Sequence, residues 1–173
     1  GQISVESKSN EIPAVQELLE ILNLKGAVVT GDAMHCQTKT VQAITEKQAD
    51  YLLQVKGNQK TLLASIVSEF DHHAEDDFSD RRVRQQTVKE KNRGREETRT
   101  CVVAPAPAAL KSKWSGLKTI GLINRTRKLA DGTEQQEQSY FISSLEPRVR
   151  VIAKHLRNHW GVENGLHYIL DVT

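Results

Sequence analysis

The sequence has few of the residues that mark specialised classes of protein. Of its 173 residues, two are cysteine, four are proline and ten are glycine. Cys36 and Cys101 are too few for a disulfide framework, and their separation does not fit a zinc-binding motif. The low glycine and proline counts exclude collagen-like and low-complexity classes. These absences leave a soluble globular protein of a reducing compartment as the expectation.

No part of the chain has the length and apolarity of a membrane segment. No apolar run approaches the ~18 residues needed to span a bilayer, and residues 1–7 are neither basic nor apolar enough for a signal peptide. We expect a cytoplasmic protein with no membrane partner. The chain begins without methionine and stops on the apolar run 166–173, which predicts a fragment of a longer protein.

The net charge is also small. Lysine and arginine number 24 against 22 aspartate and glutamate residues, a formal charge of +2, so a nucleic-acid site would have to come from the distribution of charge. Residues 69–80 hold six carboxylates and no Lys or Arg, and residues 81–99 hold eight basic side chains against three acidic ones. We expect a solvated loop or hairpin for the acidic run. The basic run predicts either a solvated loop or hairpin, or a segment that neutralises phosphates.

Short apolar runs alternate with helical patterns over residues 1–70. Residues 27–30 and 51–55 are β-rich, whereas residues 38–48 and 62–70 place apolar side chains at helical spacing. Strands that alternate with helices predict parallel βαβ units joined by right-handed crossovers. The predicted fold class is therefore α/β.

Between residues 71 and 145 the pattern becomes β-rich. Strands are expected at 98–103, 117–126 and 138–143. Asp131 and Gly132 predict a hairpin turn between the last two strands, and the proline-containing stretch 104–109 predicts a connector. We expect a roughly antiparallel insertion here.

A long helical pattern over residues 147–171 places a carboxylate where an apolar side chain should be. Its apolar stripe consists of Val149, Ala153, Leu156 and Trp160. Glu163 continues this stripe, and an unpaired buried carboxylate is costly, so Glu163 should meet a cation, a donor or solvent. Asp32 directly follows the β-rich run 27–30, where open α/β sheets bind ligands. Two converging carboxylates would bind Mg²⁺, and a pair of such ions can drive phosphoryl transfer.

Other interpretations of these residues stay open. Asp32 could instead cap the segment that follows it, and Glu163 could pair with a buried Lys or Arg. His159, Glu163 and His167 share a helix face and could hold zinc in a metal hydrolase. The HExxH pattern that would support zinc is absent.

Two further features are weaker signals. Arg150, Lys154 and Arg157 form a helical row that could neutralise phosphates. Cys36 beside His35 could be a thiol nucleophile, but no third group is identifiable, and a small buried cysteine is the better interpretation.

Several longer strings resemble those of bacterial insertion-sequence transposases, specifically the H-repeat-associated group. They are VVTGDAMHCQ at 28–37, DYLLQVKGNQ at 50–59, YFISS at 140–144 and LRNHWGVENGLHYILDV at 156–172. SKSNEIP at 7–13 and NRGREETR at 92–99 fit the same pattern. The resemblance runs along nearly the whole chain, in order.

The resemblance implies a DDE transposase with a ribonuclease-H-like core. In that fold the second Asp follows the fourth strand and the Glu lies on a later helix. Asp32 and Glu163 match these positions and would be catalytic ligands of two Mg²⁺ or Mn²⁺ ions. The implied reaction is cleavage and joining of double-stranded DNA at transposon terminal repeats. Residues 1–70 and 146–173 would belong to the core, and residues 71–145 would be a β-rich insertion.

The chain departs from the family pattern in three ways. The family's first Asp lies on a strand that would precede Gly1, so the core is expected to be partial and the chain inactive by itself. Related transposases carry Tyr, Arg and Lys around the Glu, where this chain has Leu156, His159 and Leu170; His159 and Arg157 are conjectured to take the basic role. The chain also stops within or just after the catalytic helix.

Further residues are candidates for contact with DNA. Lys56, Asn58 and Gln59 are expected either to contact DNA or to order the site. The remaining candidates are Arg93, Arg95, Arg157 and His159. A homo-oligomer of the full-length protein, associated with the nucleoid, is a further expectation. The alternative is a non-catalytic DNA- or partner-binding remnant of a decayed insertion element.

Overall fold

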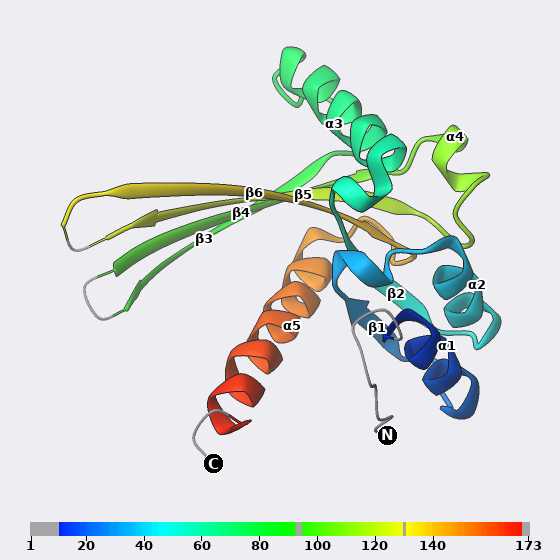
Figure 1. Cartoon of the computed structure of the whole chain (residues 1–173). Coiled ribbons are helices and arrows are strands. Elements are labelled where there is room, and N and C mark those ends of the chain that lie inside the picture. Colours follow the sequence, from blue (N-terminus) through cyan, green and yellow to red (C-terminus); the bar gives the residue numbers. More distant parts are fainter. Residues whose placement is uncertain (1–10, 93–94, 130, 171–173) are drawn as a thin grey trace.

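The computed structural model describes residues 11–92, 95–129 and 131–170 (Figure 1). The elements are α1 (Glu11–Ile21), β1 (Val28–Gly31), η2 (Ala33–His35), α2 (Thr38–Glu46), β2 (Asp50–Val55), η3 (Gly57–Gln59), α3 (Lys60–Glu75), β3 (Arg84–Asn92), β4 (Arg95–Pro105), α4 (Ala108–Lys111), β5 (Thr119–Lys128), β6 (Glu134–Ser143) and α5 (Val149–Leu170). Over these described residues no helix is both long and apolar enough to cross a bilayer.

All six strands belong to one sheet, in the order β1-β2-β6-β5-β4-β3. β1 and β2 are parallel, with Val28 opposite Asp50, and α2 connects them. Every other neighbouring pair is antiparallel. The predicted α/β class and its parallel unit are therefore confirmed. The ribonuclease-H-like assignment and the division into segments 1–70, 71–145 and 146–173 stay predictions.

Helices pack on both faces of the sheet (Figure 1). Ile44 of α2 and Ile66 of α3 belong to the larger apolar core, which includes Leu53 of β2. Ile152 of α5 belongs to a smaller core that includes Leu52. Because successive side chains of a strand point to opposite faces, the adjacent residues Leu52 and Leu53 serve the two cores. Each such buried aliphatic side chain stabilises the fold by roughly 1.5–3 kcal/mol.

The outer halves of β3–β6 extend away from α1 and α2 as an arm, defined here as residues 87–92, 95–100, 124–128 and 134–138 (Figure 1). Its side chains are mostly exposed and polar; the hydroxyls of Thr87 and Thr100, for example, are 2.9 Å apart. The inner half of β5 is buried from Thr119 to Ile123. The side chains of these strands are therefore buried in the core at one end and exposed to solvent at the other.

A buried polar network joins β6 to β2. The Ser143 hydroxyl donates to the Tyr51 carbonyl at 2.6 Å, and the Tyr51 amide donates to Ser144 Oγ at 2.9 Å. The Ser144 hydroxyl in turn donates to Asp50 Oδ1 at 2.7 Å. Buried hydrogen bonds are strong, and a shift of register would leave their polar groups unpaired at a high cost in free energy. This network therefore fixes the register in which the β-rich section meets β2.

The acidic run does not form the loop that its composition predicts. α3 continues through its first half to Glu75. Phe70, which is 3% exposed, lies within the run and packs into the larger core. The first half of the acidic run is therefore helical, with Phe70 in the core and Asp71 and Glu75 exposed to solvent.

The prediction that residues 104–109 form a connector is wrong for its first two residues. Ala104 and Pro105 belong to β4, and Ala104 is fully buried. Pro105 pairs with Thr119 of β5, but the pairing of β4 with β3 ends at Val103. Pro105 therefore has a neighbouring strand on one side, as at the edge of a sheet, where a residue without an N–H is tolerated.

Gly121 provides a test of packing between β5 and β6. It lies opposite Phe141, and a Cβ atom at position 121 would be 2.0 Å from Cζ of that ring. Gly121→Ala must displace a fully buried aromatic side chain, so we expect unfolding in urea to show a loss of about 1–3 kcal/mol. Gly57→Ala is the control, since its Cβ would meet nothing within 4 Å. Equal stability of the two variants would contradict the packing described.

Candidate active site

Asp32 lies at the carboxyl end of β1, directly after Gly31. It occupies the N-cap position of η2, but its side chain makes no capping hydrogen bond. Its side chain is 56% exposed. Asp32 is therefore the N-cap residue of η2 without a side-chain cap, and its carboxylate faces solvent at the end of a parallel strand.

His159 of α5 contacts this strand end. Its Nδ1 lies 3.1 Å from the Thr30 hydroxyl, and its Nε2 lies 3.5 Å from Oδ1 of Asp32. The imidazole is only 20% exposed. Which nitrogen carries the proton depends on the tautomer. In either tautomer, the contact brings α5 against the carboxyl end of β1.

Glu163 lies on α5 four residues after His159, so its Cα is on the same helix face, one turn further on. Its side chain is outside the described residues, as is that of His167, the other residue of the zinc interpretation. Among the side chains that the structure describes, no group of three or more His, Cys, Asp or Glu residues could hold a metal ion. The DDE and zinc assignments of α5 both stay predictions.

The segment that follows Asp32 is held by two amide side chains. Asn58 Nδ2 donates to the Ala33 carbonyl at 2.7 Å, and Gln59 Nε2 donates to the Cys36 carbonyl at 2.8 Å. Lys56 is exposed. Asn58 and Gln59 thus make contacts that order the loop beside Asp32. Sequence reasoning could not assign these contacts, because the partners are more than 20 residues apart.

The candidate basic residues divide into two groups. Arg157 forms an ion pair with Glu90 of β3, so it lies at the junction of α5 and the arm. Arg93 is outside the described residues, and only the backbone of Arg95 is described, at the start of β4. A direct role in DNA contact stays a prediction for all three.

Cys36 is fully buried in the larger core. Burial raises the pKa of its thiol to about 12, and raises the pKa of the Cys101 thiol to about 12 as well. A thiol with this pKa is not a nucleophile at neutral pH. The interpretation of Cys36 as a small buried residue is confirmed.

A family model for the transposase DDE domain matches residues 2–173. The chain therefore belongs to the DDE transposase family. It is 38% identical over 182 residues to the Escherichia coli O157:H7 protein named "Putative transposase YncI". It is 36% identical over 184 residues to the Escherichia coli K12 protein named "H repeat-associated putative transposase YhhI".

These matches cover 99% and 100% of this chain but 45% and 47% of the two relatives, so the chain spans about half of their length. No solved structure matches the chain at a significant level. The resemblance to H-repeat-associated transposases is confirmed.

The loop beside Asp32 can be tested by stability. Asn58→Ala and Gln59→Ala each remove a donor to a backbone carbonyl, so we expect each to lower the free energy of unfolding by about 0.5–1.5 kcal/mol. Lys56→Ala is the matched control from the same segment and should change it by less than about 0.5 kcal/mol. Chemical denaturation measures all three; a neutral Asn58→Ala would mean that the loop does not depend on this contact.

Thiol titration tests the burial of Cys36 and Cys101. Burial raises the pKa of both thiols in the folded chain well above the ordinary value for cysteine. Burial of the neutral thiols therefore contributes stability below the ordinary thiol pKa, and this contribution is lost as the pH rises toward 12. At pH 8 we expect a disulfide reagent to label the folded chain at least about tenfold more slowly than the urea-unfolded chain. Rapid labelling of the folded chain would show that these residues are accessible.

Proposed function

We propose that this chain supplies the second and third acidic residues of a DDE transposase active site, Asp32 and Glu163. The reaction would be cleavage and joining of double-stranded DNA at the terminal repeats of an insertion element. The observation that carries the proposal is the contact between His159 and Asp32. It brings α5, the helix that bears Glu163, to the end of β1, the strand that Asp32 directly follows.

Of the two proposed ligands, the structure describes the side chain of Asp32, whose chemistry suits a divalent cation. Asp32 presents an exposed carboxylate, and carboxylate oxygens are the ligands that Mg²⁺ and Mn²⁺ prefer. Asp32 and Glu163 would hold the ions, which would supply activation of the attacking hydroxyl and stabilisation of the leaving oxygen. His159 would orient the Asp32 carboxylate while its other nitrogen bonds Thr30. Asn58 and Gln59 would keep the adjacent loop in place.

The whole protein's partners follow from the family. Binding of DNA at transposon ends is inferred from the DDE domain, and a homo-oligomer of the full-length protein stays a proposal. The non-catalytic remnant is the alternative, and it predicts that DNA binding persists without any cleavage.

In the full-length transposase, Asp32→Asn and Glu163→Gln should abolish strand cleavage because each removes an anionic oxygen ligand. DNA affinity should change by no more than about threefold, since one exposed charge contributes little to a salt-screened interface. The assay is cleavage of a labelled duplex with Mg²⁺ or Mn²⁺, next to binding by anisotropy.

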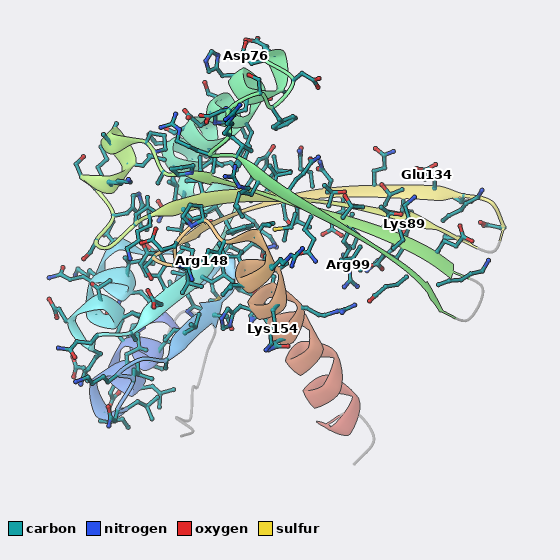
Figure 2. All side chains as sticks on the ribbon, turned by 180° about the vertical axis from the view of Figure 1, so that it is seen from behind. Asp76, Lys89, Arg99, Glu134, Arg148 and Lys154 are labelled. Carbon is teal, nitrogen blue, oxygen red and sulfur yellow. The ribbon has the colours of Figure 1, made fainter. Side chains whose placement is uncertain are left out.

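Asp76→Asn is the matched control, because Asp76 is an exposed carboxylate beyond the end of α3 (Figure 2). It should leave cleavage intact. Cleavage by Asp32→Asn at the wild-type rate would disprove the site assignment. A wild-type protein that binds but never cleaves would favour the remnant.

A further inference from the structure

Charged side chains connect α5 to the arm. Glu90 of β3 forms an ion pair with Arg157 of α5, and its other oxygen lies 3.9 Å from the Arg99 guanidinium of β4. The Arg157 and Glu90 side chains are 57% and 41% exposed. Ion pairs this exposed are weak, because water and salt screen both charges. Another anion can therefore replace Glu90 at Arg157.

Behind this pair lies a second, more buried carboxylate. Glu97 forms ion pairs with Arg99 and with Arg127, the latter at 3.0 Å, and is 20% exposed. Burial alone would raise the pKa of Glu97, but hydrogen bonds from Arg127 and Arg99, together with their charges, hold that pKa below its usual value. Glu97 is thus an anchored part of the sheet, whereas Glu90 lies at the accessible edge.

A cavity of about 210 Å³ opens beside these pairs, between α5 and the inner arm. Four cationic side chains line it: Arg99, Arg150, Lys154 and Arg157. Figure 2 shows Arg99 on the arm and Lys154 on α5 at this junction. Within the described part of the chain, no carboxylate lies within ion-pairing distance of Arg150 or Lys154. Positive charge is therefore in excess here, although the chain as a whole is nearly neutral.

The cavity has one further polar feature. The side-chain oxygen of Gln86 is buried at its lining and has no hydrogen-bond partner among the described residues. A buried amide without a partner is costly unless a ligand or water satisfies it. The Gln86 oxygen accepts hydrogen bonds and a phosphodiester has none to donate, so this atom is left to water. The excess of cations is the feature that points to an anionic ligand.

We infer that the junction of α5 and the arm is a phosphodiester-binding site. The Glu90 carboxylate pairs with Arg157 until a phosphate group displaces it. Guanidinium groups bind phosphate oxygens through paired hydrogen bonds. Arg157 lies two residues before His159 on α5, so the two side chains leave the helix on different sides and meet opposite edges of the sheet. The inference rests on the proposed function and adds to it a second place where α5 would contact DNA.

Glu90→Gln tests the exchange, because it removes the competing charge and keeps the shape of the side chain. With a 20-base-pair duplex as probe, anisotropy should show about three- to tenfold tighter binding at 100 mM salt. The slope of log affinity against log salt should steepen by up to ~0.9, the value for one more phosphate contact. Glu134→Gln makes the same charge change at the end of the arm (Figure 2), where Gln136 is its described partner at 3.4 Å. This control should change affinity less than about twofold.

A double-mutant cycle separates exchange at Arg157 from a general gain of positive charge. Arg157→Gln should weaken binding, and adding Glu90→Gln should then give no gain. An equal gain in both backgrounds would overturn the inference, because Glu90 would then act only through its overall charge. An unchanged affinity of Glu90→Gln would overturn it as well.

Inorganic pyrophosphate provides a probe that does not depend on transposase activity. It should raise the melting temperature of Glu90→Gln more than that of the wild type, and this difference should vanish with Arg157→Gln. A protein that binds pyrophosphate in this way but not DNA would contradict the proposed function and keep the anion site. A protein with neither response would contradict the site itself.

Discussion

The pairing of β6 with β2 is the constraint on which the rest of the structure depends. Tyr51 is held on both sides of its peptide by Ser143 and Ser144, and the same β6 pairs along its whole length with β5. The β-rich section is therefore continuous with the strands that precede it. Because the chain passes from β6 into α5 within a few residues, the same register also sets where the last helix begins. The Thr119 hydroxyl secures this turn by donating to the Leu145 carbonyl at 2.6 Å.

α5 then makes three contacts along its length. Ile152 packs in the smaller core, Arg157 meets the arm through Glu90, and His159 meets the end of β1. One helix therefore contacts both the candidate active site and the junction with the arm.

Local patterns predicted most helices and strands, because amphipathic spacing and β-rich runs are properties of adjacent residues. They failed where one distant contact outweighed composition. Phe70 keeps part of the acidic run helical by packing into the larger core, and Ala104 remains in β4 because the strand continues beside β5. The mixture of parallel and antiparallel pairing around β2 could not be predicted, since strands of similar pattern can pair in several orders.

The sequence by itself determined the family, the α/β class and the position of Asp32 at a strand end, because these depend on ordered strings and local periodicity. Only the tertiary structure decided what these residues touch. Asn58 and Gln59 bond the loop beside Asp32, and His159 reaches Asp32, 127 residues earlier in the chain. Glu90 neutralises Arg157, a basic residue that appears available for DNA in the sequence. Such contacts join residues far apart in the chain, so they exist only once the sheet has fixed its strand order.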